Sequence, residues 1–189
     1  MAKTGEKRDK LLDAAKTLIH RQGFYRTTLA DIAKESEVPL GNVYYYFKTK
    51  EEILAAVLEQ RWQRLQKTLD GCCVGDPVNN LIHLVKTVSK SSGKIAEFGC
   101  VIGSLCQELD KTQSEMRLSA DRIMHTHVDW ASRQFKAMGL KRPGEKGFEL
   151  IARLEGILLL GHVMREPDLI KKQLRTTCEW IKSLQSEVT

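Results

Sequence analysis

Apolar residues recur along this chain at every third or fourth position, which is the period of an amphipathic α-helix. The first clear example is the face formed by Leu11, Ala14, Ala15, Leu18 and Ile19. No segment alternates convincingly between apolar and polar residues with the period of two that a half-buried strand shows. The pattern therefore predicts an all-α protein of about nine helices.

Helix-breaking residues separate these apolar segments. The four prolines, at positions 39, 77, 143 and 167, all fall between them, where a proline starts a helix or turn without removing a helical hydrogen bond. Loops are expected at 71–77 and 141–147. The helices are expected at 7–22, 28–35, 40–47, 50–70, 77–92, 97–109, 113–138, 146–164 and 168–186.

Two of the short helices, at 28–35 and 40–47, are joined by a tight turn and have the spacing of a helix-turn-helix. In that motif the second helix enters the major groove of DNA. Short helical corners are common in all-α proteins, so the spacing alone does not decide the function. Thr28 is predicted to cap the first of these helices, and Asp31 completes a weak capping box.

The second short helix carries four adjacent aromatic residues in the stretch LGNVYYYFK. Neighbouring helical residues point about 100° apart, so the four cannot all face one core. Val43 and Phe47 are one turn apart and are predicted to be buried. Tyr44 is predicted at the edge, whereas Tyr45 and Tyr46 are predicted to point outward, where a core does not explain them.

The positive charge of the chain is concentrated at its N-terminus. The first 50 residues hold ten Lys/Arg and six Asp/Glu, a net charge of +4 out of +6 for all 189 residues. A basic N-terminal module favours a polyanionic partner such as nucleic acid.

Composition excludes several classes of protein. Hydrophobic residues make up 42% of the chain, which is enough for a core and too much for a disordered chain. No run of apolar residues is long enough to span a membrane, and the charged N-terminus is not a signal peptide. The five cysteines are an odd number without framework spacing, which favours a reduced, cytoplasmic setting.

The run LLDAAKTLIHRQGFYRTTLADIAKESEVPLGNVYYYFKTKEEIL, residues 11–54, resembles the TetR family of transcriptional regulators. Its elements occur in the family's order and without a gap. They are the pair Ala14-Ala15, the stop Gly23-Phe24, the pair Ile32-Ala33, and the signature Gly41-x-x-Tyr44-x-x-Phe47-x-x-Lys50.

The resemblance implies an all-helical homodimer that binds double-stranded DNA. Each subunit would have a three-helix DNA-binding head, residues 1–49, and a larger ligand-binding and dimerisation domain, residues 50–189. The heads would occupy successive major grooves of a near-palindromic operator, and an effector would release them. The predicted function is a ligand-responsive repressor without a cofactor. A constitutive or activating member without a small-molecule pocket is the alternative.

The resemblance also assigns DNA-binding residues. Thr28 and Lys50 match positions that reach phosphate, and Lys48 adds charge that releases counterions from DNA. Leu40 departs from the polar or basic residue that many members have, which puts base reading from that position in doubt. The positions that match the DNA-facing side of the recognition helix are Gly41, Asn42, Tyr44, Tyr45 and Tyr46.

The stretch EFGCVIGSLCQEL, residues 97–109, resembles a subset of the family with a Gly-Cys-x-x-Gly pattern. Some members of that subset sense electrophiles or oxidants through this cysteine, and Cys100 lies near the start of the expected helix. The alternative is that Cys100 is a small buried residue, because that is the commoner role of a free cysteine. A sensing thiol needs a lowered pKa.

The remaining candidates concern the effector, metals and the dimer. His125 and His127 point in opposite directions on a helix and there is no C-x-x-C, so no metal site is expected. No phosphate loop or catalytic triad occurs, so no enzyme is expected. The last two helices, about 146–186, could simply be core helices of one subunit, but the resemblance implies that they pair with those of a second copy. The candidate effector-binding residues, which core packing explains equally well, are Phe98, Cys100, Ser104, His127, Trp130 and Gln134.

Overall fold

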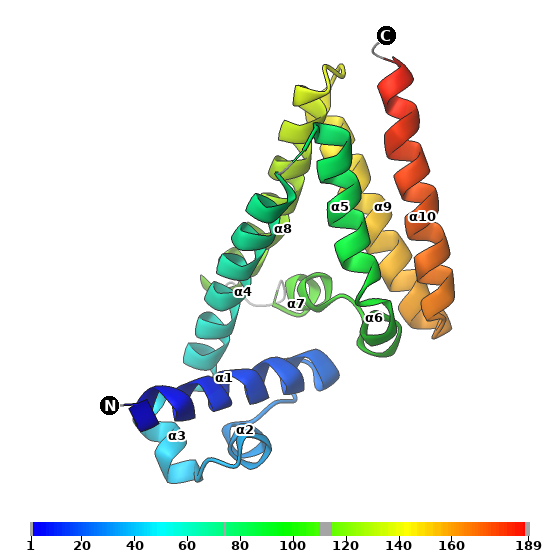
Figure 1. Ribbon diagram of the computed structural model, residues 1–189. Helices are drawn as coiled ribbons and strands as arrows, with labels where there is room; N and C mark the ends of the chain where they lie inside the picture. Colours follow the sequence, from blue (N-terminus) through cyan, green and yellow to red (C-terminus); the bar gives the residue numbers. More distant parts are fainter. Residues whose placement is uncertain (1, 74, 110–114, 188–189) are drawn as a thin grey trace. The chain divides into compact units, whose positions relative to one another are not determined.

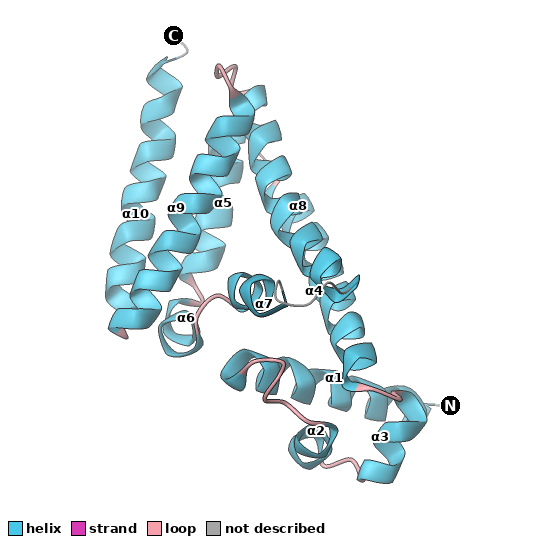
Figure 2. Ribbon diagram, turned by 180° about the vertical axis from the view of Figure 1, so that it is seen from behind, coloured by secondary structure: helices cyan, strands magenta, loops and turns pink. Residues whose placement is uncertain are grey.

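The computed structural model describes residues 2–73, 75–109 and 115–187, and all regular structure in these residues is helical (Figures 1 and 2). The predicted all-α class is therefore confirmed. The helices are α1 (Ala2–Gln22), α2 (Leu29–Ser36), α3 (Leu40–Tyr46), α4 (Lys50–Cys72), α5 (Pro77–Ser89), α6 (Ser92–Phe98), α7 (Val101–Leu109), α8 (Glu115–Ala137), α9 (Pro143–Met164) and α10 (Pro167–Ser183), followed by the 3₁₀ helix η1 (Leu184–Glu187).

The single helix predicted over 97–109 is wrong. The chain breaks at Gly99, whose backbone has φ 80° and ψ −174°, a conformation that essentially only glycine adopts. Helix α6 therefore ends one residue before this glycine, and α7 starts two residues after it. The predicted start of the next helix, at residue 113, lies outside the described residues.

Contacts divide the chain into two compact units. The first unit combines Met1–Gln63 with Ser104–Asp121, and the second combines Arg64–Gly103 with Arg122–Thr189. Each unit is thus built from two separate stretches of sequence. The functional division predicted between residues 49 and 50 follows chain order instead, and it stays a prediction.

The first unit contains the helix-turn-helix. Helix α1 packs against α2, and α2 packs against α3. Leu11 and Ala15 of α1 are fully buried, as are Val43 of α3 and Ile53 of α4. Burying one such Leu or Ile side chain contributes on the order of 2 kcal/mol, so the apolar stripes read from the sequence hold this small three-helix head together.

The second unit contains α5, α9 and α10, which lie side by side in Figures 1 and 2. Ile170, Leu174 and Ile181 place one face of α10 in the core. Gly161 allows α9 and α10 to approach closely, because a Cβ there would collide with the Ile170 side chain. None of the described helices is long and apolar enough to cross a membrane.

Candidate nucleic-acid interface and effector region

The start of α2 is fixed by reciprocal hydrogen bonds between Thr28 and Asp31. Thr28 Oγ1 accepts from the Asp31 N–H at 3.1 Å and donates to Asp31 Oδ2 at 2.7 Å, while the Thr28 N–H donates to Oδ2 at 3.0 Å. The Thr28 hydroxyl and N–H hold the pKa of the Asp31 carboxyl below its usual value. The predicted capping box is confirmed. The phosphate contact of Thr28 stays a prediction, because its hydroxyl proton is donated within the head.

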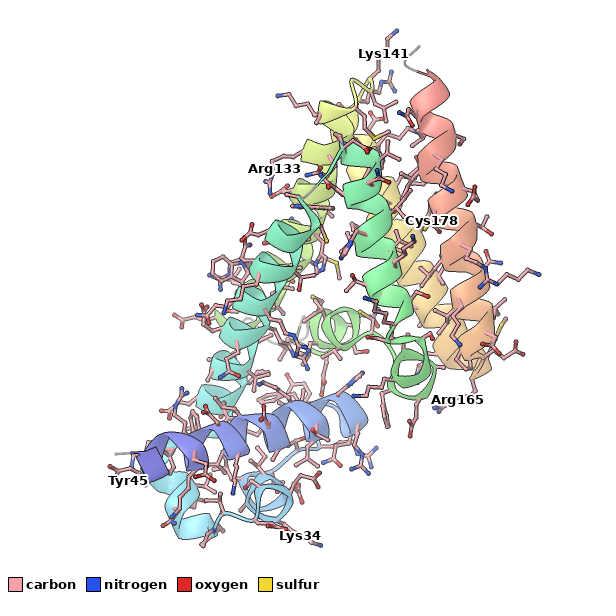
Figure 3. The ribbon with its side chains drawn as sticks, in the orientation of Figure 1. Lys34, Tyr45, Arg133, Lys141, Arg165 and Cys178 are labelled. Carbon is pink, nitrogen blue, oxygen red and sulfur yellow. The ribbon has the colours of Figure 1, made fainter. Side chains whose placement is uncertain are left out.

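In α3 and its C-cap residue, two apolar side chains are buried in the core and three large side chains are exposed to solvent. Val43 is fully buried and Phe47 is 4% exposed, as predicted. Leu40, Tyr44 and Tyr45 are 41%, 47% and 73% exposed, and Figure 3 labels Tyr45 on the head. A head of this size does not need these three large side chains for its core.

The other residues of α3 complete this exposed surface. Gly41 is exposed, and a side chain added there would meet no atom within 4 Å. Asn42 and Tyr46 are half-buried. The Tyr46 ring lies edge-on to that of Tyr45 with centroids 5.0 Å apart, so the outward orientation predicted for Tyr46 holds only in part. We call Leu40, Gly41, Tyr44 and Tyr45 the α3 face.

Two lysines follow α3 and have different surroundings. Lys48 Nζ donates to the Tyr44 carbonyl at 2.8 Å, and its side chain remains at the exposed end of α3. Lys50 Nζ donates instead to the carbonyls of Phe24 and Tyr25 at 3.3 and 3.2 Å. The family resemblance assigned Lys50 to phosphate. No sequence pattern revealed its internal role, because its carbonyl partners lie in the turn between α1 and α2.

A further cation lies beside α3. Arg8 Cζ is 5.3 Å from the centroid of the Phe47 ring, and Arg8 is exposed. The sequence did not single out this residue, because it belongs to the polar side of α1 and its neighbour is distant along the chain. It adds positive charge next to the α3 face.

Comparison with known proteins identifies a family for the N-terminal part of the chain. The model of the bacterial regulatory proteins of the tetR family matches residues 11–57, which include α2, α3 and the first turns of α4. An HTH-type transcriptional regulator from the lacX 3′ region of Lactococcus lactis is 28% identical over 182 residues, covering 91% of this chain and 93% of the relative. The regulator QacR of Staphylococcus aureus is 43% identical over 63 residues, covering 32% and 34% of the two chains.

A solved structure shows the same fold over nearly the whole chain. A TetR-family regulator from Streptomyces coelicolor superposes with a TM-score of 0.83 at 15% identity, covering 97% of this chain and 96% of its own. Residues 11–57 of the chain match the tetR family of bacterial regulatory proteins. The curated relatives that it resembles over most of its length are HTH-type transcriptional regulators and not enzymes.

Cys100 lies in the connection between α6 and α7. Its thiol donates to Glu155 Oε1 at 3.2 Å, and its Sγ accepts from the Gly103 N–H at 3.4 Å. Burial and the neighbouring Glu155 carboxylate raise the pKa of the Cys100 thiol to about 12, and burial also raises the pKa of Glu155. A reactive thiol needs the opposite shift, so these surroundings disfavour sensing by Cys100.

Three of the candidate effector residues share one side of α8. His127 Nδ1 lies 2.9 Å from the Ile123 carbonyl, and burial lowers the pKa of His127. Gln134 Oε1 accepts from Asn80 Nδ2 at 2.9 Å. Trp130 is 3% exposed, and its Nε1 has no hydrogen-bond partner among the described residues. A buried donor without a partner is uncommon and calls for an acceptor.

The remaining candidates are more dispersed. Phe98 is half-buried at the end of α6. Ser104 is exposed and belongs to the first unit, whereas the other five candidate effector residues belong to the second. Within the described residues, no three His, Cys, Asp or Glu side chains are grouped to hold a metal ion.

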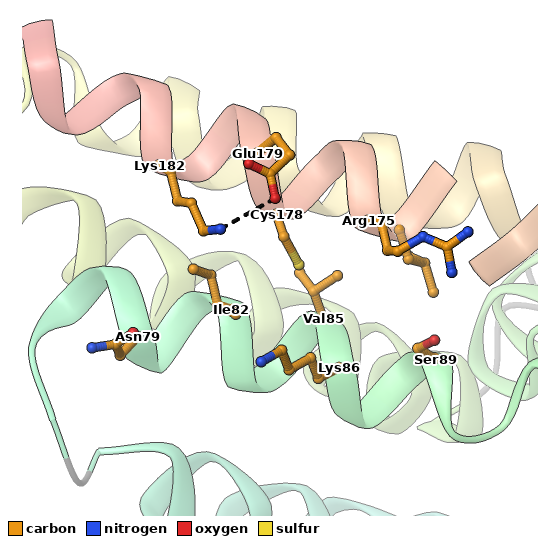
Figure 4. A pocket seen from close by; sticks show the side chains of 10 residues that line it. Asn79, Ile82, Val85, Lys86, Ser89, Arg175, Cys178, Glu179 and Lys182 are labelled. Carbon is orange, nitrogen blue, oxygen red and sulfur yellow. Dashed lines mark hydrogen bonds and ion pairs between the residues drawn. The ribbon is translucent and has the colours of Figure 1, made fainter. Parts of the chain in front are cut away.

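The second unit also has a groove between α5 and α10 that the sequence did not indicate (Figure 4). It measures about 270 Å³, and none of the candidate effector residues lines it. Cys178 and Val85 contribute to its apolar part, and Lys182 pairs with Glu179 at its edge, with Nζ and Oε1 3.2 Å apart. Burial raises the pKa of the Cys178 thiol.

Helix α9 exposes a series of apolar side chains. Phe148 and Val163 are each 67% exposed, and Leu159, Leu160 and Met164 are 54–55% exposed. Exposed apolar residues that gather on one element mark a contact surface. These five residues, called the α9 stripe below, lie within the range predicted for dimerisation.

Proposed function

We propose that this protein is a dimeric repressor that binds a near-palindromic operator and releases it when a small molecule binds. Residues 1–49 would contact the operator, and residues 50–189 would dimerise and bind the effector. A bacterial regulator of transcription must reach the chromosome, so we propose that the protein is located in the cytoplasm. The observation that carries the proposal is the α3 face, which is exposed on the second helix of the helix-turn-helix.

The chemistry of α3 suits DNA. Tyrosine hydroxyls can donate to phosphate oxygens while their rings pack on sugars, which fixes register. Gly41 lets the backbone approach base edges or a thymine methyl closely, and Asn42 can pair with adenine. Tyr44, Tyr45, Tyr46 and Lys48 would therefore position the head, and Gly41 and Asn42 would lie closest to the bases.

Leu40 would add an apolar contact to this interface. Its side chain is 41% exposed, and a thymine methyl is the apolar group that the major groove offers. Lys50 and Thr28 would reach phosphate only by giving up part of their hydrogen bonds within the head. Their contribution to operator binding is therefore proposed to be smaller than that of the tyrosines.

The buried indole of Trp130 supports a small-molecule effector. Its Nε1 needs an acceptor, so we propose an effector that is mainly apolar and carries an oxygen or nitrogen acceptor. His127 beside it would remain neutral at neutral pH, because burial lowers its pKa. The raised pKa of Cys100 argues against an electrophile as the effector.

The α9 stripe supports a homodimer. Pairing the last two helices with those of a second copy would bury this stripe in an isologous four-helix contact. A two-fold axis through that contact would present two α3 faces to two half-sites of an operator, which is the arrangement that a near-palindrome requires.

A gel shift with DNA that flanks the protein's own gene tests the proposal. At moderate salt the protein should form a specific complex with this DNA. Unlabelled flanking DNA should compete the complex away, whereas unrelated DNA should not. Absence of any specific complex would contradict operator binding. A screen of apolar compounds against that complex then separates the ligand-responsive repressor from a constitutive member, which no compound would release.

A further inference from the structure

The turn between α1 and α2, residues 23–27, leads directly into the helix-turn-helix. Gly23 begins it with φ 83°, a left-handed backbone that favours glycine. The Thr27 N–H donates to the Phe24 carbonyl at 3.1 Å, and Thr27 Oγ1 donates to the Gly23 carbonyl at 2.7 Å. These two hydrogen bonds shape the turn but leave other backbone groups that need partners.

Lys50 satisfies carbonyl groups of this turn. Its ammonium donates to the carbonyls of Phe24, Tyr25 and Thr27 at 3.3, 3.2 and 3.4 Å. It also lies 4.5 Å from the centroid of the Phe24 ring, where a cation is attracted to the ring face. One cation therefore holds the carbonyl side of the turn.

Glu108 of α7 satisfies the N–H groups of the same turn. Its Oε2 accepts from the Phe24 N–H at 3.0 Å, and its Oε1 accepts from the Tyr25 N–H at 2.8 Å. A Cβ added to Gly23 would lie 3.0 Å from Oε1, so the glycine also leaves room for the carboxylate. Charge-assisted hydrogen bonds are about twice as strong as neutral ones.

The position of the turn determines where α2 begins. Thr27 is 1% exposed, and the next residue, Thr28, caps α2. A turn that moved would carry this cap with it, and α3 packs on α2. Glu108 thus binds N–H groups of the turn that precedes α2, and Lys50 binds carbonyl groups of the same turn.

We propose that Glu108 is a positioning residue for operator binding, although it lies far outside residues 11–57 that the family model matches. It would act through the turn at 23–27 and would not touch DNA itself. This inference rests on the proposed function, because it concerns the affinity of the same helix-turn-helix for its operator.

Simple electrostatics predicts the opposite effect, which makes the inference sharply testable. The Glu108 carboxylate lies against the head and repels phosphate, so removing it should strengthen attraction to any DNA. If Glu108 positions α2, its removal should instead weaken binding to the operator. The sign of the change in operator affinity decides between the two.

The experiment compares full-length Glu108→Ala and Glu108→Gln with Gln107→Ala, an exposed neighbour on the same helix. The operator is the sequence that the unaltered protein selects from random duplex DNA. We expect Glu108→Ala to bind it about tenfold more weakly, with binding to unrelated DNA unchanged or tighter. The operator affinity of Glu108→Gln should lie between those of Glu108→Ala and the unaltered protein, because an amide oxygen can still accept a hydrogen bond from one of the two N–H groups. Gln107→Ala should match the unaltered protein.

Amide hydrogen exchange in the DNA-free protein supplies a second readout. Exchange of the Phe24 and Tyr25 amides should be faster in Glu108→Ala, measured by NMR well below its melting temperature. If the alanine variant does not fold, the glutamine variant carries both measurements. Operator affinity equal to or higher than that of the unaltered protein overturns the inference, as does unchanged exchange at both amides. If the unaltered protein selects no DNA, the proposed function fails as well.

Discussion

At the residue scale, the crowded aromatics of α3 are explained by their angles around the helix. Val43 and Phe47 fill the small core of the head, while Tyr44 and Tyr45 remain exposed. A helical period of 3.6 residues is sufficient to make that division. The periodicity does not show that the Tyr46 ring packs on Tyr45, because that contact depends on side-chain rotamers.

Tyr45 is the more exposed of the two tyrosines of the α3 face, and its hydroxyl is proposed to donate to phosphate. Tyr45→Phe removes only this hydroxyl, and the 73% exposure of the side chain predicts an unchanged melting temperature. Operator affinity should fall by about three- to tenfold and by a similar factor for related sequences, because a phosphate contact does not read bases. Fluorescence anisotropy titrations measure this.

The matched control is Tyr25→Phe, the same chemical change at another exposed tyrosine of the first unit. Phenylalanine keeps the backbone groups and the ring of Tyr25 that contact Glu108 and Lys50. It should leave operator affinity close to that of the unaltered protein. Equal losses in the two variants, or no loss in Tyr45→Phe, would remove the Tyr45 hydroxyl from the proposed contacts.

The thiol of Cys100 should be almost inert at neutral pH. Its pKa of about 12 lies above neutrality, and a raised pKa means that the reactive thiolate forms only in strongly alkaline solution. Alkylation of Cys100 by iodoacetamide should accelerate with rising pH without a plateau in the neutral range. Cys73, which is exposed, should react much faster, as peptide mass spectrometry can measure.

Glu155→Gln tests the cause of this inertness. Removing the carboxylate charge should lower the pKa of Cys100 and speed its alkylation, although burial, the larger cause, remains. Rapid alkylation of Cys100 at neutral pH in the unaltered protein would contradict this account and restore the electrophile hypothesis.

At the element scale, the sequence indicated where helices occur better than where they break. The prolines at positions 77, 143 and 167 each open a helix, as their fixed φ favours. The break at Gly99 was missed because apolar residues continue on both sides of it. A single glycine is compatible with a helix, and only the tertiary structure shows that this one separates α6 from α7.

The α9 stripe should be necessary for dimerisation. Leu159→Glu places a charge among apolar side chains that the proposed contact buries, and an unpaired buried charge is costly. We expect this variant to be monomeric at concentrations where the unaltered protein is a dimer, measured by analytical ultracentrifugation. Its operator affinity should also drop by about tenfold or more, because the two half-sites are no longer bound together.

Leu118→Glu is the control for this change. Leu118 is 68% exposed on α8, so the same substitution there should leave the dimer intact. Monomers in both variants would point to a general effect of the added charge. A dimer that survives Leu159→Glu would place the contact elsewhere.

At the scale of the whole molecule, the DNA-binding motif was far easier to predict than the rest. The head is specified by short-range signals: a cap, a glycine stop and a two-turn helix all within one contiguous stretch. Glu108 and Asn80 have partners far along the sequence, and no local pattern reveals them. The effector residues remain a proposal for the same reason, because they are contributed by separate helices.

The central claim is that two α3 faces of a dimer bind a sequence with two-fold symmetry. Selection of random duplex DNA by the full-length protein, followed by titration at several salt concentrations, tests it most directly. The account predicts two inverted half-sites separated by about one helical turn or a multiple of it, and affinity that falls steeply with salt. Enrichment of no sequence, or of a single half-site bound by one copy, would contradict it.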